Sequence, residues 1–536
     1  MAAKKAAPIL GKALFFLACA GVAAIFVWFG KTGWPGLHWD AALFGTPVIN
    51  MARNKGWLWA PGLGDAWRPL SLIRDSFVYN IHGLLHVILY GGFFKTKTWS
   101  DYTAAMGIVN ALTFASYTAL YAVLLAKRGR AGFKSYGSAL LLGLIPAVIS
   151  LGLQGRPEQI IPLLLILPLL ASLSGAKRSI SILVSALTLS LVAIASPLPG
   201  AMFFLAMITY YGLLTNRNWR ERCCDIAAFS ALTVSIGWLI ITLLTPFTPI
   251  DWVTTVLGRG SETLNLNGLL HGPADWGGWT LVAPGWSLLT IFFILSGLAA
   301  VWKRRGRVGL IAIAALVTAW IVLNQKTADY SYAPFIPYAL ALGLIAPHDL
   351  LLPKLKGDGT GTLFQRLMVA LGCVYLLVLG WYALASWLLP YQELSLKQAE
   401  TIFLQSAAGK ESNNPEIAIG YPWLRWPSMV ALGNPDASYI SLDIATQPED
   451  RDEVSRYESK TGRQIKYLVF PQTKAARNPC PPPQNLFVGR SEFSLLENHW
   501  HCPQPTLFDR IAGPTPLANR YNLAIYKRLS PPLAPP

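Results

Sequence analysis

Residues 101–130 read DYTAAMGIVNALTFASYTALYAVLLAKRGR, an apolar run that ends in a basic cluster. The apolar part, 104–126, is close to the roughly 20 residues that a helix needs to cross a bilayer. Lys and Arg, which fill the cluster after it, accumulate on the cytoplasmic side of membranes. This stretch therefore predicts a membrane-spanning helix and the direction in which it crosses.

The same pattern recurs along the chain. Only 13% of the 536 residues are charged, 53% are hydrophobic and the mean hydropathy is +0.42, so the polar surface is too small for a soluble globule of this size. We expect a polytopic α-helical membrane protein with about 11 transmembrane helices. Besides 104–126, the expected spans are roughly 13–30, 136–152, 158–174, 179–195, 199–214, 226–246, 285–302, 308–323, 333–347 and 367–389.

Basic clusters occur at every second connection between these spans, at 127–134, 176–178, 216–222, 303–307 and 353–366. This is the positive-inside pattern, and it places the N-terminus and these connections in the cytoplasm. The first run could pass for a signal peptide, but no convincing small-residue cleavage site follows it, so it is interpreted as an anchor. The net charge of +17 lies in these short clusters and forms no continuous basic face, which argues against a nucleic-acid partner.

The segment FVYNIHGLLHVILYGGFF, 77–94, is apolar enough to count as another span. A crossing there would move every later basic cluster to the outer side, so we expect a juxtamembrane helix that lies in the outer interface or is re-entrant. The first external loop then runs from about 31 to 102. His82 and His86 stand four residues apart on one face of this helix.

The composition changes after the last span. Residues 1–389 form the expected membrane domain, and 390–536 are polar and rich in proline, with strand-like runs at 416–420, 467–470 and 521–527 and an expected helix at 394–407. With an odd number of spans, this small α/β domain lies outside the cytoplasm. Cys480 and Cys502 fall in it and are predicted to pair as a disulfide. Cys19 and Cys373 are interpreted as packing residues within spans, and Cys223 and Cys224 as reduced thiols in a cytoplasmic loop.

Asp40 stands in HWDAALFG, 38–45, just beyond the first span. An ionisable group at membrane depth is costly and is usually functional unless water reaches it. Asp is also a good N-cap for the helix that would follow. On spacing alone the two interpretations are balanced.

Several stretches in order resemble the polyprenyl-phosphate-sugar-dependent glycosyltransferases of the GT-C superfamily, which include the aminoarabinose and protein O-mannosyl transferases. HWDAALFG resembles the family's acidic residue and following helix, and the other similar stretches are INMARNKGWLW (49–59), HGLLHVILYG (82–91), residues 101–130, GRPEQIIPLLL (155–165) and DYSYAPFIPYALAL (329–342). The chain departs from the family pattern at Gly83 and Leu84, which replace prolines, at Glu158, which replaces Asp, and before Tyr330, where no Arg stands.

The resemblance implies transfer of a sugar from a polyprenyl-phosphate donor to an acceptor hydroxyl on the periplasmic or extracellular face, with inversion. It assigns Asp40 as the general base, which deprotonates the acceptor. Cations on the outer side would stabilise the departing phosphate, and the candidates are Arg53, Lys55, Arg68, Arg74 and Arg156, with Tyr330 and Tyr332 as further donor contacts.

Each assignment has a structural alternative. Arg53, Lys55 and Arg74 could form a solvated or lipid-contacting face, and Arg156 could snorkel to headgroups. Glu158 could hold Arg156 by a salt bridge or meet the acceptor, and Tyr330 and Tyr332 could belong to an aromatic belt. His82 and His86 have a spacing that can bind a divalent metal, as some relatives do near this loop, but two histidines without a third ligand favour a structural role.

Two other functions stay open. A polymerase or ligase of lipid-linked glycans would use a large late loop, and 248–283 contains Arg259 and His271. A transporter or flippase of lipid-linked sugars is opposed by the absence of repeated halves and by the few charges within the spans. The expected setting is a bacterial inner membrane, with a lipid-linked donor and a glycan, lipid or protein acceptor as partners.

Overall fold

The structure is a computed structural model. It describes residues 2–32, 45, 48–49, 51–53, 83–127, 133–152, 155–215, 217–245, 248–254, 369–370, 372–377, 379–380, 383, 396–411, 416–420, 438–442, 454, 458–459, 462, 464–472, 482–488, 491–499 and 522–529.

Long helices occupy most of the expected spans that the structure describes. They are α1 (Ala2–Thr32), α4 (Trp99–Lys127), α5 (Phe133–Gly152), α8 (Arg178–Ala195), α9 (Pro197–Thr209) and α10 (Trp219–Leu244). α9 continues as the π-helix η5 (Tyr210–Leu214). Within the described residues, four helices are long and apolar enough to cross a membrane. The expected spans 285–302, 308–323 and 333–347 lie outside the described residues.

The expected span 158–174 is not one helix. It is divided into the 3-10 helix η4 (Pro157–Ile160), α6 (Ile161–Leu164) and α7 (Ile166–Leu173). Pro162 stands in the first turn of α6, and Pro168 lies within α7. Proline lacks the N–H that a continuous helix requires, so it favours breaks of this kind.

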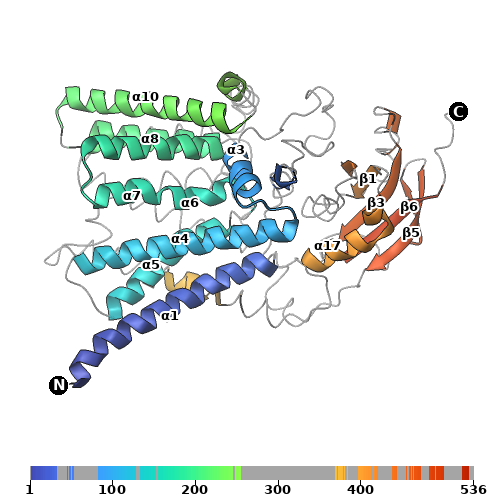
Figure 1. Ribbon diagram of the computed structural model, residues 1–536, viewed down its shortest axis with the longest axis horizontal. Helices are drawn as coiled ribbons and strands as arrows, with labels where there is room; N and C mark the ends of the chain where they lie inside the picture. Colours follow the sequence, from blue (N-terminus) through green and yellow to red (C-terminus); the bar gives the residue numbers. More distant parts are fainter. Residues whose placement is uncertain are drawn as a thin grey trace, which may run out of the picture.

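The helices form an antiparallel bundle in which α4 packs between α1 and α5, and α8 contacts α7, α9 and α10 (Figure 1). Gly30 and Gly107 let α1 and α4 approach closely. A Cβ on Gly30 would lie 2.7 Å from the Cα of Gly107, and a Cβ on Gly107 would lie 2.7 Å from the carbonyl oxygen of Phe26. Small residues permit this backbone contact between membrane helices, where the lipid gives no hydrophobic drive for association.

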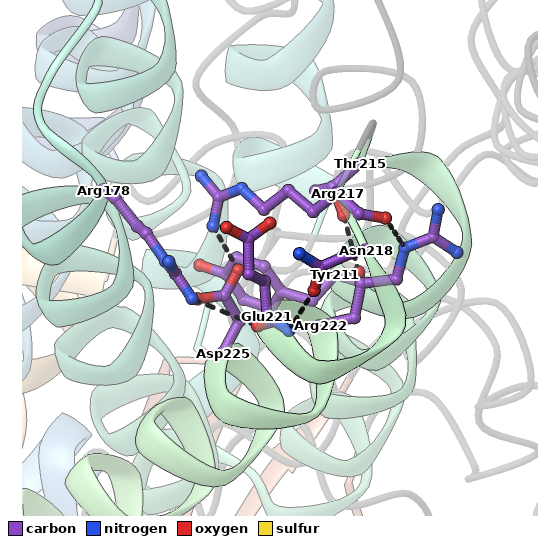
Figure 2. A network of polar contacts seen from close by, with 8 residues as sticks. All are labelled: Arg178, Tyr211, Thr215, Arg217, Asn218, Glu221, Arg222 and Asp225. Atoms are coloured by element: carbon purple, nitrogen blue, oxygen red, sulfur yellow. Dashed lines mark hydrogen bonds and ion pairs between the residues drawn. The ribbon is translucent and has the colours of Figure 1, made fainter.

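One end of the bundle, called here the Asp225 end, collects basic side chains around a buried acid (Figure 2). The Nε of Arg178 donates to the Oδ1 of Asp225 at 2.6 Å, and Arg217 pairs with the other carboxylate oxygen. The Nε of Arg222 donates to the carbonyl of Arg217 at 2.8 Å. The clusters at 176–178 and 216–222 therefore share one end, as the alternation of basic connections predicted.

Cys223 and Cys224 lie in α10, so the prediction of a loop there was wrong. The Asn218 side chain accepts a hydrogen bond from the backbone N–H of Glu221 at 2.9 Å and caps the helix, which begins at Trp219. Both cysteines are exposed and have free thiols.

The opposite end, called here the α3 end, carries a short helix. α3 (Leu84–Val87) continues as the π-helix η3 (Ile88–Phe93), and Figure 1 shows this unit at the ends of α4 and α8. Its ten residues extend about 15 Å, half of the hydrocarbon thickness of a bilayer. Leu84 packs with Ile194 of α8 and with Ile241 of α10. The described part of the segment 77–94 is therefore too short to cross.

The C-terminal residues form a mixed six-stranded sheet of order β2-β1-β3-β6-β5-β4, in which β1 runs parallel to β2 and β3 and the other pairs are antiparallel. The strands are β1 (Glu416–Gly420), β2 (Ser438–Leu442), β3 (Ile465–Gln472), β4 (Asn485–Val488), β5 (Ser491–His499) and β6 (Asn522–Arg528), and the helices are α17 (Leu396–Gln405) and α18 (Ala407–Lys410). α17 contacts α4, and the sheet lies beyond the α3 end (Figure 1). Cys480 and Cys502 lie outside the described residues.

Candidate functional site

A buried ion pair lies at the start of η4, between its N-cap residue and its second residue. The Nε of Arg156 lies 2.9 Å from the Oε2 of Glu158, and its Nη2 donates to the Oε1 at 3.2 Å, so the contact is bidentate. The hydroxyl of Ser196 also donates to Oε1, at 3.1 Å. The two charged side chains are only 9% and 6% exposed. Gly155, with a φ of +88°, makes the turn that lets residues two apart face each other.

Gln159 connects this turn to its surroundings. Its Nε2 donates to the carbonyl of Met106 at 3.2 Å and to the Oδ1 of Asn110 at 3.0 Å, and its Oε1 accepts from the hydroxyl of Tyr90 at 3.1 Å. Ser150 Oγ lies 2.7 Å from Asn110 Oδ1 and 2.8 Å from the carbonyl oxygen of Gln159. A buried amide is stable only with such partners. These bonds fix η4 to α4, α5 and η3.

His86 lies in the same cluster. It is fully buried, its Nε2 is hydrogen-bonded to the hydroxyl of Tyr102, and its ring meets Tyr90 edge-on at 4.6 Å between centroids. Burial lowers the pKa of His86 to about 3, and the negative charge of Glu158 opposes this shift only in part. The imidazole is therefore neutral at physiological pH.

The end of the HWDAALFG stretch packs against this cluster. A Cβ on Gly45 would lie 2.3 Å from the Trp99 ring and 2.8 Å from the Tyr102 ring. A Cβ on Gly91 would lie 2.7 Å from the carbonyl oxygen of Val48. Only glycines fit at these contacts, so the helical residues after Asp40 are held tightly on η3 and on the first turn of α4.

The structure thus brings together Arg156, Glu158 and His86 of the predicted site residues. Arg53 is fixed nearby, because its Nε donates to the carbonyl of Lys97 at 2.8 Å. Glu158 holds Arg156, as the salt-bridge interpretation expected. Within the described residues no group of three or more His, Cys, Asp or Glu side chains could hold a metal ion. The other predicted residues, Asp40, Lys55, Arg68, Arg74, His82, Tyr330 and Tyr332, lie outside the described part of the chain.

Sequence reasoning missed the polar partners that hold the cluster. Gln159, Asn110 and Ser150 stand in apolar surroundings of the sequence, and Tyr90 and Tyr102 were read only as parts of longer motifs. The signal that could have found them is the rarity of amide side chains within membrane-spanning runs, where each needs a hydrogen-bond partner.

No protein-family profile matches the sequence, and no curated protein matches it. The search of solved structures returned the arabinofuranosyltransferase AftD from mycobacteria, with 16% identity and a TM-score of 0.46, over 96% of this chain and 40% of AftD. ArnT from Cupriavidus metallidurans, bound to undecaprenyl phosphate, matches with 11% identity and a TM-score of 0.42, over 95% of this chain and 97% of ArnT. The apo oligosaccharyltransferase of Archaeoglobus fulgidus matches with 13% identity and a TM-score of 0.34, over 85% of this chain and 69% of that protein. This chain therefore spans less than half of the length of AftD.

Proposed function

We propose that the protein is a membrane glycosyltransferase that moves a sugar from a polyprenyl-phosphate donor to an acceptor hydroxyl. The reaction takes place at the α3 end, on the outer face of a bacterial inner membrane. The chain crosses the membrane about 11 times, starting in the cytoplasm, and 390–536 form an α/β domain on the outer side. The acceptor is a glycolipid, a glycan or a protein.

The observation that carries the proposal is the meeting of four sequence motifs, which lie in HWDAALFG, HGLLHVILYG, 101–130 and GRPEQIIPLLL. Gly45 of HWDAALFG contacts Tyr102, Tyr102 is hydrogen-bonded to His86 of HGLLHVILYG, and Tyr90 of that motif is hydrogen-bonded to Gln159 beside the Arg156–Glu158 pair. Asp40 precedes Gly45 by five residues, which an extended chain can span over about 18 Å at most. We infer that this short separation brings the proposed base near the buried Arg156–Glu158 pair.

The chemistry requires two groups. Asp40 takes the proton of the acceptor hydroxyl as the oxygen attacks the anomeric carbon from the face opposite the phosphate. The bond from that carbon to the phosphate oxygen breaks, and the polyprenyl phosphate leaves with the electron pair. Arg156, oriented by Glu158 and Ser196, faces the growing phosphate charge. Arg53, Lys55, Arg74, Tyr330 and Tyr332 are the remaining candidates for donor contacts.

Asp40→Asn tests the assignment of the base. Purified full-length protein in detergent is supplied with a polyprenyl phosphate that carries a labelled sugar, and the new glycosidic bond is measured. We expect transfer to fall by about 10²–10⁴-fold while donor binding persists. Asp101→Asn is the matched control, since Asp101 is exposed and only caps α4 by accepting from the Thr98 N–H at 3.1 Å. Unchanged transfer by Asp40→Asn would remove Asp40 as the base.

The same assay separates the rival functions. A transporter or flippase forms no glycosidic bond in detergent, where no compartments exist. A polymerase or ligase would form one, but its activity would depend on Arg259 and His271 rather than on Asp40.

A further inference from the structure

The turn that joins η3 to α4 has an unusual backbone. The N–H and the hydroxyl of Thr96 both donate to the carbonyl oxygen of Tyr90, at 3.1 and 3.0 Å, and the N–H of Phe94 donates to Leu89 at 2.9 Å. Between them, Lys95 has a φ of +51°. The other positive φ values among the described residues belong to glycines. Lys95 thus occupies the left-handed position that closes a helix C-terminus and that glycine usually fills.

A lysine at this position is disfavoured by its own Cβ. Lys95 and Lys97 are both exposed, and neither forms an ion pair within the described residues. They stand two residues apart on one short turn. Two exposed cations on one turn can meet an anionic ligand.

A third cation joins the turn from a distant part of the sequence. Arg53 donates from Nε to the carbonyl of Lys97 at 2.8 Å. The segment before Arg53 is fixed on η3, since a Cβ on Gly92 would lie 3.4 Å from the Met51 side chain. The bond from Arg53 to the backbone of Lys97 joins these three cationic residues at one turn, and we call them the cationic turn.

The cationic turn lies at the α3 end, opposite the basic clusters of the Asp225 end. Positive charge on this side is not explained by the rule that orients the chain. Two aromatic residues precede the turn: Phe93 is 77% exposed, and Phe94 stacks on Tyr90 at 5.8 Å between centroids. Tyr90 is in turn hydrogen-bonded to Gln159 of the candidate site. The turn thus combines cations, an exposed apolar ring and a direct connection to the buried cluster.

We propose that Lys95 and Lys97, with Arg53, bind the phosphate of a polyprenyl phosphate, while Phe93 contacts its hydrocarbon chain. The inference rests on the proposed function and adds residues that hold the departing polyprenyl phosphate. Three positive charges match this phosphate monoester, which carries roughly two negative charges, better than the single charge of a phosphodiester such as the sugar donor or a lipid headgroup. Lysines suit this role as point charges on flexible stems.

Binding of farnesyl phosphate to the full-length protein in detergent tests the proposal. Lys95→Gly removes the side chain and relieves the backbone, so its thermal midpoint should equal or exceed that of the unmodified protein. The double variant Lys95→Gly/Lys97→Gln should bind farnesyl phosphate about tenfold more weakly. Farnesol, which has no phosphate, should bind both proteins alike. The matched control is Lys177→Gln, an exposed lysine at the Asp225 end, which should bind as the unmodified protein does.

Equal binding by the double variant would overturn the proposal, as would equal weakening by Lys177→Gln, which would indicate only a general effect of net charge. Competition by detergent-solubilised phosphatidylglycerol at the same phosphate concentration would show a site for bulk lipid and would also refute it. The proposed function fails separately. If the unmodified protein transfers no sugar but its binding of farnesyl phosphate still depends on Lys95 and Lys97, the proposed function is refuted and the phosphate site is supported. If transfer depends on Asp40 and the double variant still binds normally, only the cationic turn is refuted.

Discussion

Removing one partner of the Arg156–Glu158 pair should destabilise the protein more than removing both. Two charges about 4 Å apart attract by about 4 kcal/mol at an effective dielectric constant near 20. Both side chains are less than 10% exposed, so the survivor of a single substitution remains a buried charge without its bidentate partner. We expect Arg156→Met or Glu158→Leu alone to lower the free energy of unfolding by about 3–5 kcal/mol.

The double variant Arg156→Met/Glu158→Leu should recover most of that loss, because a well-packed apolar pair also avoids the desolvation of two charges. The measurement is the denaturation midpoint of each purified variant in one detergent. Arg178→Met is the matched control. The Arg178 side chain is 42% exposed and Asp225 keeps Arg217 as a second partner, so this variant should lose about 1 kcal/mol at most.

Stability and transfer should then separate in the double variant, which is expected to fold but not to transfer sugar. Two results contradict this reasoning. If the losses of the single variants simply add in the double variant, the two residues do not act as a pair. If the stable double variant transfers sugar at the normal rate, Arg156 has no role at the phosphate.

Three further outcomes follow from the contacts of single residues. Gly45→Ala should lower the thermal midpoint by an amount that corresponds to about 1–3 kcal/mol, because the new Cβ would lie 2.3 Å from the Trp99 ring. Gly137→Ala is the control and should not lower it, since a Cβ there meets nothing within 4 Å. Equal midpoints for the two variants would contradict the close packing of Gly45 on Trp99. Because the pKa of folded His86 is about 3, the unfolded chain binds more protons than the folded protein below pH 6.5, so stability should fall as the pH is lowered from 6.5 towards 3. His86→Asn should remove this dependence on pH from thermal midpoints measured between pH 7 and 4, and an unchanged dependence would refute the reasoning. Burial alone would raise the pKa of Glu411, but hydrogen bonds from Lys466 and Tyr467 and nearby positive charge lower it. Its contribution to stability is therefore present above the ordinary pKa of 4.5 and is lost as the pH falls further. Glu411→Gln should remove this loss from a curve of stability against pH, and an identical curve would contradict the reasoning.

The elements of the fold follow closely from local patterns in the sequence. Apolar runs near the length of a membrane span became α1, α4, α5, α8 and α10, and the strand-like runs at 416–420, 467–470 and 521–527 lie within or overlap β1, β3 and β6. Period and length are properties of neighbouring residues, so they can be read directly. The break within 158–174 is also local, since Pro162 and Pro168 were visible in the sequence.

The contacts of the site are not local and could not be read in this way. Gln159 reaches Asn110, 49 positions away, and Tyr90, 69 positions away. Which amide meets which hydroxyl depends on how α4, η3 and η4 pack, and the spacing within one helix does not determine that packing. The left-handed backbone of Lys95 could not be predicted either, because glycine usually fills this conformation and the residue here is a lysine.

The arginines at the two ends of the bundle differ in how far their side chains are exposed. At the Asp225 end, Arg178 and Arg217 are 42% and 30% exposed, so water and headgroups solvate much of their charge. An arginine that only orients the chain needs no more than this. At the α3 end, Arg156 is buried and paired with Glu158, whose carboxylate also accepts from the hydroxyl of Ser196. A buried ion pair contributes little net stability, so this arrangement agrees with our proposal that the guanidinium of Arg156 meets the phosphate during transfer.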